Sequence, residues 1–396
     1  MNIAIDGRTI TRNKTGVGSY AERLVRALLQ CDSINHYYLF LIEPNDRIAG
    51  PNVTKIMSVG YGPPILNRYW ENVVLPKEIQ RYNIDIFFCP AYVLPFFVRF
   101  GHTLANIPIP MSLRYFFNSH RKVKYVVTIH DVISRIYPEY FTLKMRIWQR
   151  FFLWNGQRSA DRVIADSQST KNDIIRFYPA YRDRVTVIYP ELDDSFQIIT
   201  DETMLVRTKE EYSLPKKFIL YVGTIEPRKN VEGIAAAYSN LPSDIQSQYD
   251  LVIGGNIGWY AKKIFNEIKI QRLENRIHFI GYVDDSFLPS LMTLASVFVF
   301  PSFYEGFGYP PLEAMACGVP VVSSNTSSLL EAVGNAAILV DPTDVQQISR
   351  AIENILSNGE LAAELRRKGL ERLNLFSWKK CAEETLGIFE EVVRQK

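Results

Sequence analysis

Cysteine is scarce in this sequence. Its four copies stand far apart in the chain, at Cys31, Cys89, Cys317 and Cys381. They form no CxxC pair, and no histidine stands near them at the spacing of a metal ligand, so the sequence suggests neither a disulfide framework nor a zinc site. We expect these four residues to be buried thiols.

Long hydrophobic runs are also lacking. The longest uncharged apolar run, residues 86–98, is too short to span a bilayer and contains Pro90 and Pro95. Near the N-terminus, Asp6 and Arg8 interrupt the stretch that a secretory signal would need to be apolar. We therefore expect no transmembrane helix and no cleaved signal, and we expect the protein to act in the cytoplasm.

A large excess of charge of one sign is missing too, because 45 Lys and Arg residues stand against 42 Asp and Glu residues. This near balance hides an asymmetry. Residues 1–198 carry 25 basic and 17 acidic side chains, whereas residues 199–396 carry 20 and 25. A basic half suits an anionic partner such as a membrane surface, a phosphorylated lipid or a nucleic acid, and scattered surface charge explains it equally well.

With 396 residues and 47% hydrophobic content, the chain is long and apolar enough for two globular domains. Short β-like runs alternate with amphipathic helical stretches in both halves, which favours parallel sheets, and a polar linker is expected at 192–214. The expected strands are 2–6, 37–42, 85–89, 125–129, 162–165, 184–188, 218–222, 250–253, 276–280, 297–300 and 320–323. We predict an α/β protein with an N-terminal domain of residues 1–198 and a C-terminal domain of residues 199–378, followed by a helix that includes residues 379–396.

Two carboxylates, Glu305 and Glu313, flank the start of a predicted helix in the segment EGFGYPPLE. Open α/β sheets bind ligands at the carboxyl ends of their strands, and this segment follows the strand expected at 297–300. Gly306 and Gly308 leave the backbone bare ahead of the helix, so its N–H groups and positive dipole end can hold a phosphate. We therefore expect Glu305, in the loop, to hold a transferred sugar and Glu313, in the first helical turn, to hold a ribose. A pair of helix-capping glutamates is the alternative explanation.

Two adjacent cations stand in the loop GTIEPRKN, which opens with Gly223 after the strand expected at 218–222. Arg228 offers a planar fork and Lys229 a point charge, and together they suit the neutralisation of a departing diphosphate. Ordinary surface charge is the alternative. The surface-charge explanation is weaker because the loop at Glu305 is also suited to an anion.

A glycine loop, KTGVGSYA, matches the dinucleotide fingerprint G-x-G-x-x-A at Gly16 and Gly18, with Glu43 as a ribose acceptor. In the usual setting of that fingerprint the glycines follow the first strand at once, whereas here residues 7–15 intervene. A glycine loop that contacts a phosphate held by the opposite domain fits this spacing better.

A fourth loop begins with His130 and Asp131, at the end of the strand expected at 125–129. His130 can hydrogen-bond a sugar hydroxyl or act near the acceptor, and a purely structural histidine is the alternative.

No metal is expected, because the Asp-Asp pairs at 193–194 and 284–285 lack the third acidic position of a divalent-ion clamp.

Together these motifs resemble the retaining glycosyltransferases with the GT-B fold, in particular glycosyltransferase family 4, whose hallmark is a glutamate pair spaced E-x7-E. Glu305 and Glu313 match that hallmark, GTIEPRKN is similar to the diphosphate loop, and TGVG to the N-terminal glycine loop. TIHD and residues 165–173 are similar to signatures of the acceptor domain. The resemblance covers nearly the whole chain. It implies two Rossmann-like domains facing a central cleft, with the C-terminal helix, 379–396, crossing back to the N-terminal domain.

The resemblance also implies a nucleotide-sugar donor held mainly by the C-terminal domain, with no metal and no other cofactor. The catalytic residues that it implies are His130, Arg228, Lys229 and Glu305. The residues that it implies around the nucleotide sugar are Gly16, Gly18, Gly223, Tyr282, Val283, Phe307, Gly308 and Glu313. In this scheme the two cations hold the diphosphate, Glu305 the sugar and Glu313 the ribose, while Tyr282 and Val283 border the base.

No residue stands out as a covalent nucleophile, so we expect front-face attack in which the departing diphosphate helps to deprotonate the acceptor hydroxyl. The stretch EGFGYPPLEAMACGVPVV is most similar to mannosyltransferase-type members, which implies GDP-mannose as the donor and cell-surface polysaccharide as the product. UDP- or dTDP-sugars, rhamnose included, are the alternative donors. Leu330 departs from the family pattern, in which many relatives carry proline.

The segment 99–124 is longer than the corresponding connection in the family that the chain resembles. It interleaves basic residues, among them Arg114 and Arg121, with aromatic ones. We expect it to dock the acceptor, a glycan or a polyprenyl-diphosphate-linked glycan, at the inner membrane face, with Asp131 as a further acceptor residue. A disordered surface loop is equally compatible with this segment.

Three other functions fit parts of the sequence. An NAD-dependent oxidoreductase would use Gly16 and Glu43, but it leaves the glutamate pair and the two cations without roles. A non-hydrolysing sugar-nucleotide epimerase shares the architecture and would act without an acceptor. A nucleic-acid binder is the weakest alternative, because no recognisable reader module accompanies the basic charge.

Overall fold

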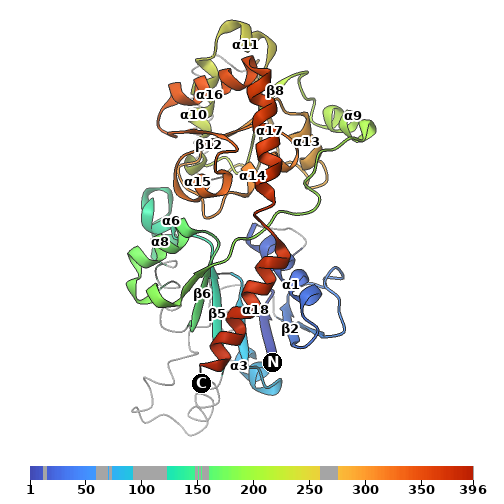
Figure 1. Ribbon diagram of the computed structural model, residues 1–396, viewed down its shortest axis with the longest axis vertical. Helices are drawn as coiled ribbons and strands as arrows, with labels where there is room; N and C mark the ends of the chain where they lie inside the picture. The colour runs from blue at the N-terminus through green and yellow to red at the C-terminus, as the bar shows by residue number, and fades with distance from the viewer. Residues whose placement is uncertain are drawn as a thin grey trace. The chain divides into compact units, whose positions relative to one another are not determined.

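The computed structural model describes residues 1–11, 16–58, 70, 74–91, 123–147, 150, 153, 160–258 and 275–395. The chain divides into two compact units (Figure 1). Unit 1 comprises Met1–Glu191 together with Ser377–Lys396, and unit 2 comprises Leu192–Phe376. Residues 192–198, which the sequence analysis assigns to the N-terminal domain, fall in unit 2, where Ile198 lies against Gly318.

A helix, α9 (Glu202–Glu211), lies inside the stretch that the sequence analysis treats as a polar linker. Asp201 caps this helix by accepting hydrogen bonds from two N–H groups of its first turn, and Arg207 lies over the Phe287 ring at 5.2 Å. The linker prediction was wrong here because the apolar residues of α9, Met204, Leu205 and Val206, stand in a row and form no apolar face. With Thr208 as its buried residue, it gives little helical periodicity to detect.

Among the described residues, unit 1 contains a seven-stranded parallel sheet in the order β3-β2-β1-β4-β5-β6-β7. Its strands are β1 (Asn2–Asp6), β2 (His36–Leu41), β3 (Val53–Met57), β4 (Ile86–Cys89), β5 (Lys124–Ile129), β6 (Arg162–Ala165) and β7 (Val185–Val187). The sequence predicts all of these to within a residue except β3. That edge strand escaped prediction because none of its residues is buried, which weakens the hydrophobic alternation.

The two faces of this sheet carry separate cores. Ile3 and Ile5 of β1 belong to the core shared with α1 (Gly16–Cys31) and α18 (Trp378–Arg394), whereas Ala4, between them, belongs to the core of the other face. This is the two-residue alternation that a pleated strand imposes. The C-terminal helix α18 thus returns to the N-terminal unit, as the family resemblance implies.

Shorter helices complete the described part of unit 1. They are α3 (Leu75–Arg81), α6 (Ile133–Ile136), α8 (Gln168–Phe177) and the 3-10 turns η4 (Pro138–Tyr140) and η5 (Pro179–Arg184). The segment 99–122, with Arg114 and Arg121, lies outside the described residues, so the acceptor roles expected for these two arginines stay predictions.

Unit 2 contains, within its described residues, a six-stranded parallel sheet in the order β10-β9-β8-β11-β12-β13. Its strands are β8 (Phe218–Val222), β9 (Asp250–Gly254), β10 (Ile277–Gly281), β11 (Val297–Phe300), β12 (Val321–Ser324) and β13 (Ile338–Val340). Its other elements are η6 (Pro227–Lys229), α10 (Val231–Ser239), α11 (Ser243–Gln248), α13 (Leu288–Leu294), α14 (Tyr309–Ala316), α15 (Ser327–Val333), α16 (Val345–Ser357) and α17 (Gly359–Leu373). Short β13 is missing from the sequence analysis.

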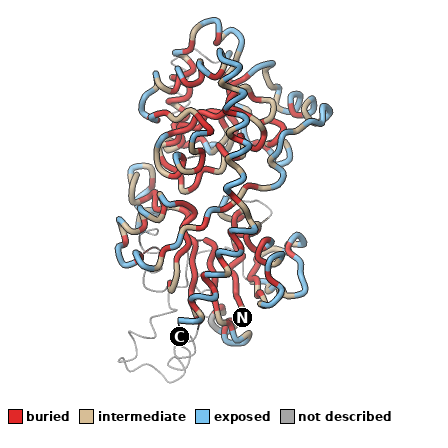
Figure 2. The backbone as a smooth tube through the Cα atoms, viewed as in Figure 1, coloured by how far each residue is buried: buried red, intermediate tan, exposed pale blue. Residues whose placement is uncertain are grey.

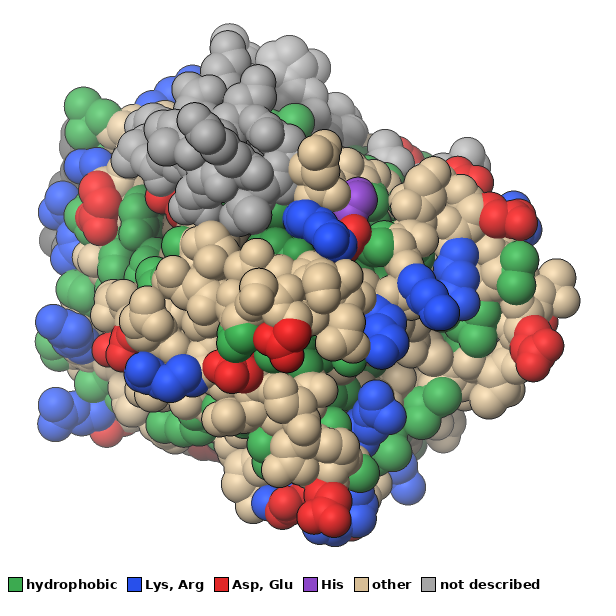
Figure 3. Space-filling model, turned by 90° about the horizontal axis from the view of Figure 1, so that it is seen from above, with side chains coloured by type: hydrophobic (Ala, Val, Ile, Leu, Met, Phe, Trp, Pro, Cys, Tyr) green, Lys and Arg blue, Asp and Glu red, His purple; other side chains and the backbone are tan. Residues whose placement is uncertain are grey.

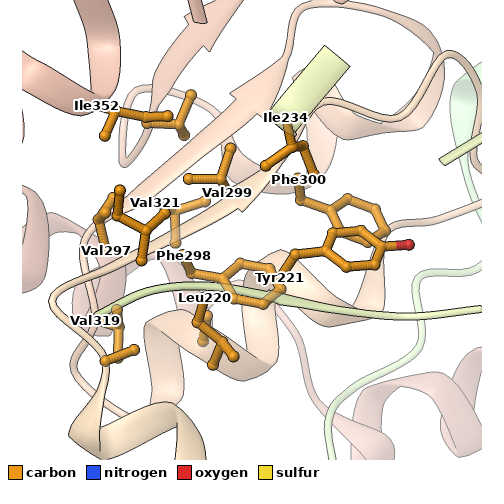
Figure 4. Packing of buried hydrophobic residues seen from close by; sticks show 14 of the residues in the cluster. Leu220, Tyr221, Ile234, Val297, Phe298, Val299, Phe300, Val319, Val321 and Ile352 are labelled. Carbon is orange, nitrogen blue, oxygen red and sulfur yellow. The ribbon is translucent and has the colours of Figure 1, made fainter. Parts of the chain in front are cut away.

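The four inner strands of unit 2, β9, β8, β11 and β12, are buried along most of their length, whereas most residues of the edge strands β10 and β13 are not (Figure 2). Figure 4 shows the centre of this core, where Tyr221 of β8 and Phe300 of β11 lie nearly parallel with ring centroids 5.9 Å apart. Strands β8 and β11 are paired neighbours, so this packing fixes the position of their carboxyl ends. The loops that follow these two strands carry the polar residues described below.

No helix among the described residues is both long and apolar enough to cross a membrane. On the face drawn in Figure 3, the described Lys and Arg side chains are interspersed with Asp and Glu side chains. This face therefore offers no extended surface of one charge sign among its described residues.

Candidate active site

The order of strands in unit 2 reverses between β8 and β11, because β9 and β10 lie on one side of β8 while β11, β12 and β13 lie on the other. Open α/β sheets bind ligands at the carboxyl ends of the strands that flank such a switch point. Arg228 and Lys229 follow β8, and Glu305 follows β11. The sheet order alone therefore brings the two predicted cations and the predicted sugar-binding carboxylate to one edge.

Glu305 is held by both cations. Its Oε1 accepts from Lys229 Nζ at 2.6 Å, and its Oε2 accepts from Arg228 Nη1 at 2.7 Å. Ser302 Oγ donates to Oε1 at 2.7 Å, and the Glu305 main chain bonds the hydroxyls of Ser327 and Ser328. Every one of these partners belongs to unit 2.

A second carboxylate, Glu226, holds the other edge of the Arg228 guanidinium. Its Oε1 lies 3.0 Å from Arg228 Nε and 2.6 Å from Nη2, and its side chain is almost completely buried. Arg228 Nη1 also donates to the Tyr304 carbonyl at 2.9 Å. The sequence analysis missed Glu226, although its position two residues before Arg228 in the same loop is a signal that could have found it.

These four charges form a buried network with two cations and two carboxylates, called here the Arg228 network: Glu226, Arg228, Lys229 and Glu305. Burial would raise the pKa of the Glu305 carboxyl, but the two cations and the hydrogen bonds to it lower this pKa to about 2. Burial and the neighbouring charge of Arg228 lower the pKa of the Lys229 ammonium, against the opposing effect of Glu305. Glu305 is therefore ionised at neutral pH and accepts hydrogen bonds only.

The backbone around the network is fixed by Asn230, which has the left-handed conformation with φ 58°. Its side-chain amide donates to the carbonyls of Pro301 at 3.2 Å and Pro342 at 2.7 Å. Asparagine tolerates this conformation better than most residues, so it can close the turn η6 and begin α10 at once. The sequence analysis gave Asn230 no role.

Glycines line the same edge of the sheet. The N–H of Gly223 donates to the Gly254 carbonyl at 3.0 Å, and the N–H of Gly255 donates to the Gly281 carbonyl at 2.7 Å. A Cβ at Gly255 would lie 2.0 Å from the Gly223 carbonyl oxygen, and Gly255 has φ 137°, so a side chain is excluded there. The loops after β8, β9 and β10 therefore approach one another through bare backbone.

The segment between the two glutamates has the predicted loop-to-helix form. Gly308, with φ 112°, precedes α14, and two prolines lie in its first turn, where a missing N–H costs little. Glu305 lies in the loop, but Glu313 lies in the second turn of α14 and not in the first, which corrects the sequence prediction. The helix begins at Tyr309, so the fifth helical residue already belongs to the next turn.

The other predicted nucleotide-sugar residues divide between surface and core. Tyr282 is 59% exposed, whereas the side chains of Val283 and Phe307 are buried in the hydrophobic core of unit 2. Val283 and Phe307 therefore offer mainly their backbone to a ligand. The contacts that the sequence analysis assigns to these residues, and to Glu313 and Gly308, stay predictions.

In unit 1, His130 lies at the carboxyl end of β5 and is tightly held. Its Nδ1 lies 2.5 Å from Asp166 Oδ2, its Nε2 lies 2.8 Å from the Pro90 carbonyl, and Tyr20 packs edge-on against its ring. Both nitrogen partners are acceptors, so both ring nitrogens must carry protons to satisfy them. Burial would lower the pKa of His130, but the charge of Asp166 and these hydrogen bonds raise it above its ordinary value.

The neighbouring residues of unit 1 have structural partners. Asp131 accepts from the Ile133 N–H at 3.1 Å at the start of α6. At the end of β1, Arg8 forms a buried bidentate pair with Asp6, both contacts being 2.8 Å, and lies over the Trp70 ring. The sequence analysis used Asp6 and Arg8 only as evidence against a secretory signal and did not name Asp166 individually.

The predicted glycine loop is only partly described. Gly16 is the first residue of α1 and Gly18 lies in its first turn, while residues 12–15 lie outside the described part of the chain.

No group of three or more His, Cys, Asp or Glu residues that could hold a metal occurs in the described ranges. One of the Asp-Asp pairs considered from sequence, 284–285, includes Asp284, whose carboxylate accepts from the N–H and hydroxyl of Ser286.

Two family models match this chain. The model for glycosyltransferase family 4 matches residues 14–196, and the model for glycosyl transferases group 1 matches residues 206–372. Together they account for most of both units. The first model ends at residue 196 and the second begins at residue 206, shortly after the first segment of unit 1 ends at Glu191.

Individual proteins agree with these models. An O-antigen chain mannosyltransferase B of Escherichia coli is 30% identical over 95% of this chain and 96% of its own length. A serotype-specific mannosyltransferase WbdA of Escherichia coli is 33% identical over 65% of this chain, which spans only 32% of that longer protein. The solved structure of a sucrose-phosphate synthase from Thermosynechococcus elongatus superposes with a TM-score of 0.75 over 100% of both chains at 22% identity, which shows the same fold. The chain belongs to glycosyltransferase family 4, with two parallel-sheet Rossmann-like domains, and is a hexosyltransferase.

Proposed function

We propose that this enzyme transfers mannose from GDP-mannose, with retention of configuration and without a metal ion, onto a glycan of a cell-surface polysaccharide. The observation that carries the proposal is the Arg228 network at the switch point of unit 2. Two cations beside a carboxylate suit a ligand that joins a diphosphate to a sugar, because the first needs positive charge and the second needs hydrogen-bond acceptors. The mannosyltransferase names of the two Escherichia coli relatives support mannose as the sugar.

The reaction would use the network as follows. The diphosphate takes Arg228 and Lys229 as partners, which releases Glu305 to accept hydrogen bonds from sugar hydroxyls. The bond from the anomeric carbon to the β-phosphate oxygen breaks, and the acceptor oxygen bonds the same face of that carbon while its proton passes to the departing phosphate. The cations stabilise the charge that develops on the leaving group, so positioning and electrostatics carry the rate.

The acceptor would be held by unit 1, with His130 at the carboxyl edge of its sheet. Its doubly protonated ring would place a positive charge near the acceptor, held in orientation by Asp166. A polyprenyl-diphosphate-linked glycan is the acceptor class that we propose, with contact between the enzyme and the inner membrane face during transfer. Mannosyltransferases named for O-antigen synthesis are consistent with that class.

The base and the metal requirement can be tested in one experiment. Thermal unfolding of the purified protein is measured with GDP, UDP, dTDP, ADP and NAD, each with and without Mg²⁺. A ligand at 100 times its Kd stabilises the native state by about 2.7 kcal/mol. Stabilisation by GDP alone, equal in both conditions, is expected. Stabilisation by UDP or dTDP would replace mannose as the sugar, a requirement for Mg²⁺ would remove the metal-free scheme, and a response to NAD alone would overturn the proposal.

The role of the cations is tested by Lys229→Ala. We expect kcat/KM to fall roughly 10²- to 10³-fold, the cost of removing one group that stabilises developing charge. The loss of stability should be much smaller than the loss of activity, because Glu305 keeps Arg228 and Ser302 as partners. Lys209→Ala, at an exposed position on α9, is the matched control. Equal losses of activity and stability in Lys229→Ala would contradict this role.

A further inference from the structure

We propose that Glu226 is a positioning residue of the sugar-nucleotide site, one that orients Arg228 and limits how tightly the site holds the nucleoside diphosphate product. This inference rests on the proposed function, because it needs a diphosphate bound at Arg228 and Lys229. Glu226 is distinct from Glu305 in the Arg228 network: Glu305 faces Arg228 from the loop after β11, whereas Glu226 lies in the same loop as Arg228.

The guanidinium of Arg228 is divided between the two carboxylates. Glu226 takes one edge, with Nε at 3.0 Å and Nη2 at 2.6 Å from the same oxygen, while Glu305 takes Nη1 at 2.7 Å. A planar guanidinium pinned at two nitrogens cannot rotate about its own axis. Glu226 therefore sets the direction in which Nη1 points, and it does so whether or not Glu305 is engaged.

Glu226 itself is fixed by its place in the backbone. It precedes Pro227 and is extended, with φ −145° and ψ 157°, as a residue before proline prefers. The preceding residue, Ile225, donates its N–H to the Asn256 carbonyl and accepts from the Gly258 N–H. With an exposed fraction of 2%, Glu226 has little access to solvent. A ligand that displaces Glu305 from the cations would leave Glu226 in place.

The charge of Glu226 then has a defined effect on the bound state. With Glu305 turned toward the sugar, Arg228 and Lys229 face the diphosphate. Glu226 remains at the Nε and Nη2 atoms of Arg228 and offsets one of the two positive charges. The Glu226 carboxylate is buried and lies 2.6 Å from Arg228 Nη2, so water screens its charge poorly. Glu226 thus weakens the hold on the diphosphate, which favours its release after the sugar has left.

The test compares Glu226→Gln, Glu226→Asp and the exposed control Glu210→Gln on α9. Calorimetry measures the Kd of whichever nucleoside diphosphate stabilises the wild-type protein, and steady-state kinetics measure kcat and the KM of the sugar donor. For Glu226→Gln, which keeps the shape but loses the charge, we expect the Kd and KM to fall roughly tenfold while kcat also falls. For Glu226→Asp, which keeps the charge but is shorter, we expect the Kd to stay within about twofold and kcat to fall.

The outcomes distinguish a failure of the proposed function from a failure of the inference about Glu226. If the wild-type protein binds no nucleoside diphosphate, the proposed function fails. If it binds one, and Glu226→Gln weakens binding or leaves the Kd and kcat unchanged, the inference about Glu226 is overturned. A parallel loss of activity and melting temperature in both variants would likewise reduce Glu226 to a structural residue. Glu210→Gln is expected to match the wild type in every measurement, because its side chain is exposed outside the network.

Discussion

The two sheets of this enzyme share one strand order over six positions, yet they use the switch point differently. In unit 2, side-chain ion pairs join the loop after β8 to the loop after β11, from Arg228 and Lys229 to Glu305. In unit 1, the ion pair after β1 is local, because Asp6 and Arg8 are two residues apart. The same scaffold therefore carries an ion-pair network between two loops in unit 2 and an ion pair between near neighbours in sequence in unit 1.

The two units differ in whether a ligand can replace one partner of the ion pair. In unit 2, Arg228 and Lys229 share Glu305 as a partner. An incoming anion can replace the Glu305 carboxylate without leaving either buried cation unpaired. In unit 1, Arg8 is bound bidentately by its own neighbour and covered by Trp70, so the pair is suited to holding the loop. The His130–Asp166 pair of unit 1 instead joins the loops after β5 and β6. Four predictions test this contrast.

The largest effect is expected from Glu305→Ala in unit 2. This change leaves Arg228 and Lys229 adjacent and buried without their shared partner, which should lower the free energy of unfolding by about 3–5 kcal/mol. Chemical unfolding at pH 7 measures it, with Glu210→Ala as the exposed control. A loss below about 1 kcal/mol would mean that the bridging network contributes no more than a surface pair.

The same residue gives a pH dependence. The pKa of Glu305 is lowered from 4.5 to about 2 in the folded protein, so its contribution to stability is complete above pH 4.5 and is lost as the pH falls toward 2. The difference in unfolding free energy between wild type and Glu305→Gln should therefore shrink over that interval. A difference that stays constant from pH 5 to pH 2.5 would contradict the low pKa.

A smaller effect is expected from Asp166→Asn in unit 1. The pKa of His130 is raised in the folded protein, so the stability that its charge contributes is complete below the ordinary pKa of 6.5 and is lost as the pH rises through the folded value. Because a hydrogen bond to a charged group is worth about 1.5–3 kcal/mol, the variant should lose that amount at pH 6 and less at pH 9. The His130 pKa, measured by NMR, should fall in the variant although Asp131 remains; an unchanged pKa would remove Asp166 as its cause.

The smallest effect is expected from Arg162→Ala, outside both switch points. Arg162 Nη2 donates to Glu391 Oε1 of α18 at 2.6 Å, and the Glu391 side chain is about half exposed. Exposed pairs contribute about 0.2–1 kcal/mol, so the melting temperature should fall slightly, and less so in 1 M salt. A loss comparable to that of Glu305→Ala would show that α18 depends on this pair more than on its apolar face.

The strands and the cation pair Arg228–Lys229 could be predicted because their signals lie within short stretches of sequence. A strand such as β8 is a run of apolar residues, and the pair Arg228–Lys229 stands directly after it. The prediction was wrong for α9, whose apolar residues show no helical periodicity, and it placed Glu313 one turn too early. Asn230 escaped notice because its partners, the carbonyls of Pro301 and Pro342, lie in other loops. Glu226 escaped notice because only the folded loop shows that its carboxylate pairs with Arg228 two residues on.

The sequence by itself determined the alternation of strands and helices, the glutamate pair spaced E-x7-E, and the position of two cations after a strand. Only the tertiary structure decided that Glu305 lies between those cations, across 77 residues of chain, and that Asn230 reaches Pro342 across 112. The physical reason is that strand order is set by the packing of whole sheets. The pairing of β8 with β11 brings distant loops together, and burial then makes their charges depend on one another.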